Sequence, residues 1–171
     1  GKRHLVGMPG NGSCLLPNGA HDLGSCRRDK ILNGGVVQLV GEETGTIFDT
    51  AGHTITVNSV MQGEGKLEVN GSGTLKLAHA SGTSDISDLS GTGKFVKAGA
   101  GNLNLHKASL ANATFKGNGT TTISGDVSIT GNSTNPTRFQ HPVAGTYKKE
   151  CNEMGKKYFS VASGGGTGRT L

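Results

Sequence analysis

The sequence predicts an all-β protein, folded as a parallel β-helix with irregular caps at both ends. Three observations support this fold class. Glycine supplies 30 of the 171 residues, tryptophan is absent and aromatic residues make up 4%, which suits many tight turns better than a core of large side chains. Short runs alternate apolar and polar side chains, the period of a half-buried strand. One stretch of the chain also occurs twice.

The repeated stretch is residues 63–81, GEGKLEVNGSGTLKLAHAS, which returns 28 positions later as residues 91–109, GTGKFVKAGAGNLNLHKAS. An ungapped repeat indicates one structural unit used at least twice. In a β-helix, equivalent residues of successive coils stack about 4.8 Å apart, so this offset predicts columns of like side chains. The predicted columns are Leu75 with Leu103, Leu77 with Leu105, and Leu67 with Phe95.

A coil of 28 residues would be longer than the minimal coil of roughly 20. We therefore expect a loop to bulge out of the coil, and Ser81–Ser90, which carries Asp85 and Asp88, is the candidate. An antiparallel sandwich is the alternative fold, but it prefers strands of about five or six residues.

The expected strands are short and closely spaced from residue 36 to residue 129. In order, the apolar runs are Val36–Val40, Thr46–Phe48, Thr54–Val57, Val60–Met61, Lys66–Val69, Thr74–Leu77, Ile86 with Leu89, Lys94–Lys97, Asn102–Leu105, Leu110, Ala113–Phe115, Thr120–Ile123 and Asp126–Ile129. Turns of the Gly-x-Gly, Asn-Gly or Ser-Gly kind separate them. No window of useful length has helical periodicity.

Three segments follow from this pattern. We expect an irregular N-terminal cap over residues 1–34, because turn signals crowd this part of the chain. The β-helix repeats are expected over residues 35–133, in about four or five coils. Residues 134–171 are expected to form a basic C-terminal cap that ends in a flexible glycine-rich tail. The chain lacks an initiating methionine and a signal-peptide pattern, so we interpret it as a mature or excised segment.

The net charge of +5 lies in the two flanks, while the middle of the chain is slightly acidic. Basic flanks attract acidic partners such as sulfated glycans, although solubility is the simpler reading. The scarcity of aromatic side chains argues against nucleic acid, and no apolar run is long enough to cross a bilayer. The candidate binding surface is Arg27, Arg28, Lys30, Asp85, Asp88, Lys148, Lys149, Lys156 and Lys157.

The three cysteines are Cys14, Cys26 and Cys151. The first two could close a short loop as a disulfide in an oxidising compartment, which leaves Cys151 as a free thiol or an intermolecular link. Zinc is the alternative, with Cys14, His21 and Cys26 as ligands and His4 as a fourth, but their spacing matches no standard finger. We predict neither a metal nor a cofactor.

No complete catalytic motif occurs in the chain. The acidic pairs Glu42/Glu43 and Asp85/Asp88 have no clear basic partner, and neither a phosphate-binding loop nor a G-x-S-x-G sequence is present. The histidines at strand ends, His53, His79 and His106, are interpreted as surface residues. We therefore predict that the chain is not an enzyme.

Two segments, Lys66–Leu77 (KLEVNGSGTLKL) and Phe95–Leu105 (FVKAGAGNLNL), carry a resemblance. Their order of strand, glycine-rich turn and Leu-x-Leu strand resembles the passenger domains of bacterial autotransporters of the pertactin and AIDA type. The likeness covers roughly residues 35–133 and not the cysteine-bearing flanks. It implies a right-handed β-helix, export to the bacterial surface or medium, and adhesion or a toxin-like action on a host cell.

The resemblance gives the functional expectation. We expect a secreted or surface-exposed virulence factor that binds a host-cell protein receptor or a sulfated matrix glycan. Some small passengers of this family are diffusible ligands, and the Bartonella angiogenic autotransporters act on an endothelial growth-factor receptor. Two alternatives are a carbohydrate-active enzyme on the same fold and a structural stalk that associates with copies of itself.

Overall fold

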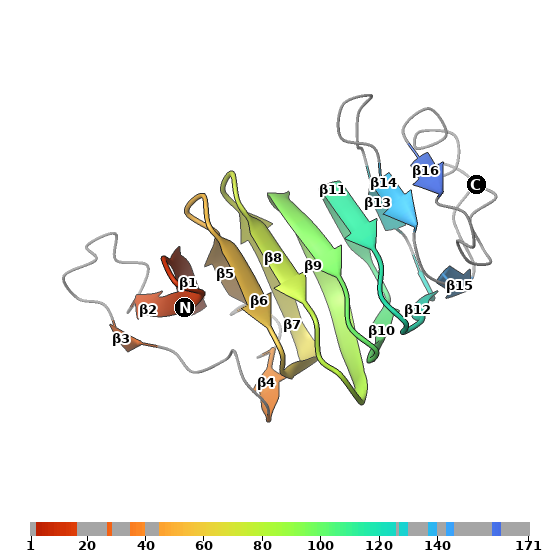
Figure 1. Ribbon diagram of the computed structural model, residues 1–171, viewed down its shortest axis with the longest axis horizontal. Helices are drawn as coiled ribbons and strands as arrows, with labels where there is room; N and C mark the ends of the chain where they lie inside the picture. Colours follow the sequence, from red (N-terminus) through yellow and green to blue (C-terminus); the bar gives the residue numbers. More distant parts are fainter. Residues whose placement is uncertain are drawn as a thin grey trace.

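The computed structural model describes residues 3–16, 27–28, 35–39, 45–125, 127–129, 137–139, 143–145 and 159–161. For residues 27–28, 127–128 and 137 onward, the backbone alone is described. All elements of the described chain are strands, and they belong to one 16-stranded sheet that winds through about four turns. The predicted parallel β-helix is thereby confirmed, with its coils stacked along the long axis of the molecule (Figure 1). No helix in the described part could cross a membrane.

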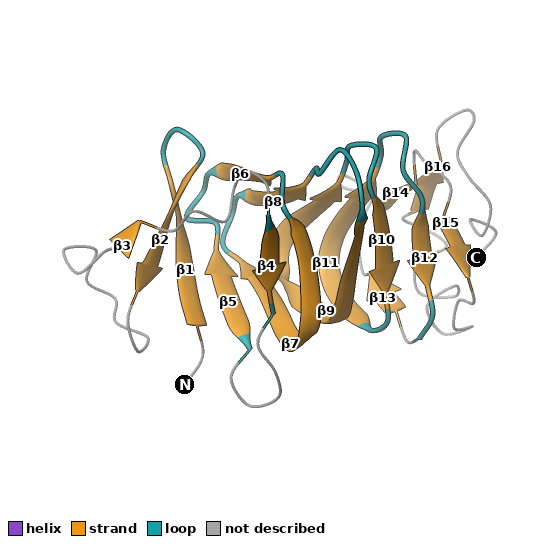
Figure 2. Ribbon diagram, turned by 90° about the horizontal axis from the view of Figure 1, so that it is seen from below, coloured by secondary structure: helices purple, strands orange, loops and turns teal. Residues whose placement is uncertain are grey.

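The strands form three parallel stacks, which we call face 1, face 2 and face 3; successive strands lie side by side along them (Figure 2). Face 1 contains β5 (Thr46–Asp49), the second half of β7 (Val60–Asn70), the middle of β9 (Thr83–Lys97), the start of β11 (Ala108–Phe115) and β13 (Val127–Ile129). Face 2 contains β6 (Thr54–Val57), β8 (Thr74–Leu77), the ends of β9 and β11, β14 (Thr137–Phe139) and β16 (Phe159–Val161). Face 3 contains β4 (Val36–Gln38), the starts of β7 and β9, β10 (Asn102–Leu105), β12 (Thr121–Ile123) and β15 (Val143–Gly145).

The strand register corrects the length of the coil. Thr74 pairs with Lys94, 20 residues later, and Leu103 pairs with Thr121, 18 residues later. The sequence offset of 28 is therefore one coil plus one face, and the two copies of the repeat do not lie over each other. The first copy runs from face 1 to face 2, whereas the second runs from face 2 to face 3.

The predicted columns of like side chains are accordingly wrong. Leu75 lies opposite Phe95, and Leu103 lies opposite Ser84 on another face. The inward columns of face 2 are Ile55, Leu75, Phe95 and Ala113, and beside them Val57, Leu77, Lys97 and Phe115, all buried. Parallel strands still stack side chain over side chain, but at an offset close to 20.

The predicted bulging loop at Ser81–Ser90 is also wrong, because residues 83–90 lie within β9. Its inward side chains Ile86 and Leu89 are fully buried. A coil of about 20 residues leaves no excess chain to bulge.

Two glycines explain why the repeat recurs at a different face. Gly63 and Gly91 have φ angles of 135° and 128°, a region that other residues avoid. A Cβ atom at Gly63 would lie 2.2 Å from the carbonyl oxygen of Leu39, and one at Gly91 would lie 1.9 Å from that of Val69. The same tight corner is therefore used at two successive corners of the helix.

The N-terminal end of the stack is more regular than we expected. There β1 (Arg3–Met8) pairs in parallel with β5 and in antiparallel with β2 (Gly12–Leu16), and β2 pairs with β3 (Arg27–Arg28). The side chain of Asn11 covers the exposed edge of β6, because its Oδ1 accepts the N–H of Thr56 at 2.5 Å and its Nδ2 donates to the Thr56 carbonyl at 3.2 Å. The predicted cap over residues 134–171 falls outside the described residues, apart from the backbone of β14, β15 and β16.

Candidate functional site

The predicted binding residues are described only in part. Asp85 and Asp88 have described side chains, whereas for Arg27 and Arg28 the backbone of β3 alone is placed. The remaining candidates, Lys30, Lys148, Lys149, Lys156 and Lys157, lie outside the described residues, as do Cys26, Glu42 and Glu43. A binding role for these residues therefore stays a prediction.

Three polar side chains from successive coils meet where face 3 turns into face 1. Asp85 Oδ1 lies 2.7 Å from His106 Nε2, and His106 Nδ1 lies 2.6 Å from Ser124 Oγ. We call Asp85, His106 and Ser124 the polar corner. The side chains of Asp85 and His106 are about half exposed, at 47% and 45%, so solvent reaches the cluster.

Charges of opposite sign alternate beside the polar corner. Lys66 and Asp88 share one register position, and their Nζ and Oδ2 atoms lie 3.9 Å apart. Lys107 follows in the next coil, since its carbonyl accepts the N–H of Leu89. Alternation avoids stacking like charges, and an exposed pair of this kind adds at most about 1 kcal/mol of stability.

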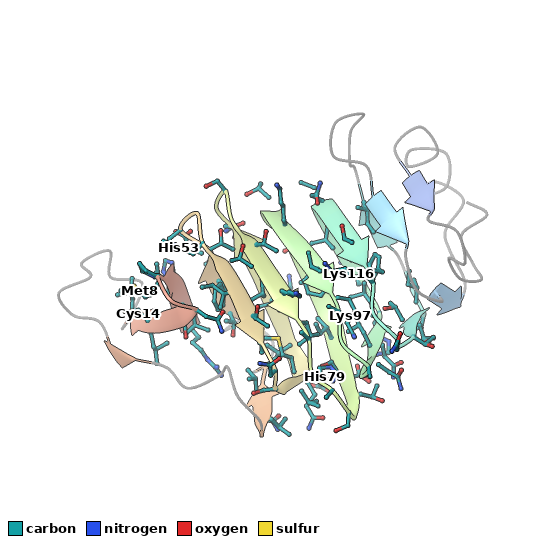
Figure 3. The ribbon with its side chains drawn as sticks, viewed as in Figure 1. Met8, Cys14, His53, His79, Lys97 and Lys116 are labelled. Atoms are coloured by element: carbon teal, nitrogen blue, oxygen red, sulfur yellow. The ribbon has the colours of Figure 1, made fainter. Side chains whose placement is uncertain are left out.

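Face 2 has a different surface. Its described outward side chains are threonine, asparagine, valine and lysine, and no carboxylate belongs to its strands between Thr54 and Phe115. Lys76 and Lys94 lie on this face in adjacent coils, and Lys116 follows directly where β11 ends (Figure 3). We call Lys76, Lys94 and Lys116 the basic face. Within the described chain neither Lys76 nor Lys94 forms an ion pair.

A buried network lies between the coils at the turn after β8 (Figure 3). His79 Nδ1 lies 3.0 Å from the Ser81 carbonyl oxygen, so this nitrogen donates; Nε2 then accepts from the Ser84 hydroxyl at 2.7 Å. Ser84 Oγ in turn accepts the N–H of Met61 at 3.0 Å. Every member is satisfied, which is the condition for a stable buried network. The prediction that His79 is a surface residue is wrong, since it is 2% exposed.

Burial changes two ionisable groups in this region. Burial lowers the pKa of His79, the hydrogen bond to Ser81 opposes this shift, and the nearby charge of Lys97 adds to it. Burial also lowers the pKa of Lys97 from 10.5 to about 8. The Nζ of Lys97 donates to the carbonyl oxygens of Ala98 at 2.5 Å and Gly101 at 2.7 Å. These inward groups hold the turns and cannot meet a ligand.

Cys14 is buried and disulfide-bonded. The register of β2 and β3 places Arg28 opposite Cys14, which brings the chain just after Cys26 beside it. The pairing with Cys26 remains a prediction. Among the described residues, no group of three or more His, Cys, Asp or Glu side chains could hold a metal ion.

Sequence reasoning missed most of the residues that the fold gathers. His106 was interpreted only as a surface residue, and Ser124, Lys76 and Lys94 were not singled out. Their signal is spacing near 20: Asp85, His106 and Ser124 are separated by 21 and 18 positions. The longer offset of the repeat hid this period.

Comparison with known proteins gives one partial similarity. Residues 111–171 match the model of a family described as GGGtGRT protein. The letters of that description correspond to Gly164–Thr170, in the tail that we expect to be flexible. The match covers less than half of the chain and leaves out most of the β-helix. No curated protein and no solved structure matches the chain.

Proposed function

We propose that the chain is an exported, autotransporter-type binding protein that attaches to a sulfated glycan on a host-cell surface through the basic face. In this proposal the β-helix is a rigid support, and the glycan lies across the coils of face 2. A protein receptor is the alternative partner. The proposal describes a binding protein rather than an enzyme.

The arrangement of Lys76 and Lys94 is the observation that carries the proposal. Neighbouring parallel strands are about 4.8 Å apart and strand residues about 3.3 Å. Two positions along the strand and one coil across therefore separate these lysines by roughly 8 Å at the backbone. No carboxylate lies between them on the described part of face 2. A linear polyanion can follow such a row of cations, since it keeps its own hydration on the outer side.

The disulfide of Cys14 supports export. Disulfides persist in oxidising compartments and are rare in the cytosol, and Cys14 is bonded in this way. The glycine-rich turn between Lys97 and Gly101 and its flanking strands support the autotransporter resemblance, because they form the coil that the resemblance implies.

The test compares two double variants of equal charge change. Lys76→Glu with Lys94→Glu reverses the basic face, whereas Lys66→Glu with Lys107→Glu reverses two lysines near the polar corner. Binding of each protein to immobilised heparin and to cultured host cells would be measured, with soluble heparin and desulfated heparin as competitors. We expect the basic-face variant to bind at least about tenfold more weakly, which corresponds to about 1.4 kcal/mol, while the control binds nearly as the parent does.

Equal weakening by both variants would contradict a site on face 2, because it would show attraction by net charge alone. Cell binding that desulfated heparin blocks as well as heparin does would rule out sulfate recognition. Cell binding that is indifferent to heparin would favour the protein receptor instead.

A further inference from the structure

The polar corner contains two of the hydrogen bonds of a serine hydrolase. A catalytic triad needs a serine hydroxyl bonded to an imidazole, and a carboxylate that orients the other ring nitrogen. Ser124, His106 and Asp85 meet both conditions at 2.6 Å and 2.7 Å. The two imidazole nitrogens are exchanged relative to the usual triad, because Nδ1 here faces the serine and Nε2 faces the carboxylate.

The carboxylate fixes the proton on the imidazole. Asp85 Oδ1 can only accept while it is ionised, so the hydrogen bond places a proton on His106 Nε2. His106 Nδ1 then has a free lone pair and accepts the hydroxyl proton of Ser124. This is the protonation pattern of a general base ready to activate an alcohol.

The β-helix holds the three groups in register. The N–H of His106 bonds to the Ile86 carbonyl and the N–H of Ser124 bonds to the Leu105 carbonyl, both at 3.1 Å. Each side chain therefore starts from a strand that is paired with the coil beside it. Sites built on strands keep their geometry better than sites on loops.

The residue after the serine can supply an oxyanion donor. The backbone N–H of Gly125 makes no hydrogen bond within the described chain. A Cβ atom at this position would lie 2.0 Å from the His106 carbonyl oxygen, so only glycine allows the chain to pass this close. In serine hydrolases of another fold, the N–H of the residue after the nucleophile serves the oxyanion in the same way.

We propose that the polar corner hydrolyses short-chain carboxylic esters, with Ser124 as nucleophile and His106 as general base. Ser124 Oγ bonds to the acyl carbon as its proton passes to His106 Nδ1. The ester C–O bond breaks, and the alcohol leaves with that proton. Water then attacks the acyl-serine and gives a proton to His106, which returns it to Ser124 Oγ as the acid departs. This activity is separate from glycan binding on face 2.

The substrate class follows from the exposure of the corner. With Asp85 and His106 about half exposed, an acyl group and a water molecule can both approach the serine. Short acyl groups are favoured, because the side chains around the cluster are charged or polar and offer little apolar surface to a long chain.

The experiment uses p-nitrophenyl acetate and a fluorophosphonate probe on the full chain. We expect a covalent adduct at Ser124 by peptide mass spectrometry. We also expect Ser124→Ala and His106→Gln to lower the ester turnover number at least about tenfold, near the lower limit for general-base catalysis. Asp85 acts through His106 as a positioning residue, so Asp85→Asn should lower kcat and leave KM unchanged. Ser109→Ala, an exposed serine on face 1, is the control and should keep full activity.

Histidine alone can cleave activated esters, so the Ser124→Ala result decides. If Ser124→Ala keeps the parent rate, or if the probe labels another residue, the proposal is overturned. Circular dichroism and the thermal midpoint of each variant confirm that loss of activity is not loss of fold. Parent activity no greater than that of His106→Gln would overturn the proposal as well.

Discussion

The ammonium group of Lys97 lies 2.7 Å from the carbonyl oxygen of Gly101, inside a column whose neighbouring members are Leu77 and Phe115. In the repeat, Lys97 takes the place that Val69 has in the first copy. A long cation thus occupies an apolar position, and it is tolerated because the turn that follows supplies two carbonyl acceptors. The charge is still costly, since burial disfavours the protonated form.

We predict that stability rises with pH as Lys97 loses its proton. The pKa is about 8 in the folded chain and 10.5 ordinarily, so between these values the unfolded chain binds more protons. The unfolding free energy therefore increases from about pH 8 to pH 10.5. Other lysines and tyrosines titrate in this range, so the measurement is the difference between the parent and Lys97→Met in urea unfolding at several pH values. Parallel pH curves for the two proteins would contradict the prediction.

The network around Ser84 should be costly to break. Ser84→Ala leaves the N–H of Met61 without its acceptor and His79 Nε2 without its donor, both in the interior. We expect the unfolding free energy to fall by about 1–3 kcal/mol. Ser109→Ala, on an exposed position of β11, should change it by less than about 0.5 kcal/mol. A loss at Ser84 no larger than that at Ser109 would mean that water satisfies the network.

The corner glycines should be intolerant of a methyl group. In Gly91→Ala the new Cβ would meet the Val69 carbonyl oxygen, so we expect a loss of about 3 kcal/mol or more. Gly63→Ala should cost a similar amount, because it forms the same corner one position earlier. Gly10 also has a positive φ but faces open space, and Gly10→Ala should cost about 1 kcal/mol. Chemical denaturation of the three variants gives the comparison.

The disulfide can be assigned by changing one cysteine at a time. We predict that Cys26→Ser frees the thiol of Cys14 and lowers the unfolding free energy by about 2–4 kcal/mol, because the unfolded chain gains the entropy of an open loop. Cys151→Ser should leave both quantities unchanged. Peptide mapping of the non-reduced protein would show the linkage directly, and a Cys14–Cys151 peptide would refute this assignment.

Much of the fold could be predicted from local pattern. The runs at 54–57, 74–77 and 102–105 alternate strictly, and they form strands with the predicted bounds. A period of two reports which side chains face inward whatever the coil length. For this reason β8 and β10 were placed correctly even though the stacking predicted for them was wrong.

The coil length could not be read from the repeat, because each corner of the helix asks for the same residues. Gly63 and Gly91 are equivalent by local geometry, not by position in successive coils. The repeat therefore reports corners, and an offset of one coil plus one face looks the same as one long coil. Since the candidate sites depend on which residues lie in adjacent coils, they were lost with the coil length.

The central claim is that coils of about 20 residues stack as the strand pairs indicate, because the polar corner and the basic face exist only at that register. Lys76 then lies opposite Val96, whereas the 28-residue offset would place it opposite Asn104. Cysteine pairs at 76 and 96, and at 76 and 104, would be oxidised in a Cys151→Ser background and mapped by mass spectrometry. We predict an efficient disulfide for the 76–96 pair and none for the 76–104 pair. A 76–104 disulfide without the 76–96 one would contradict the account.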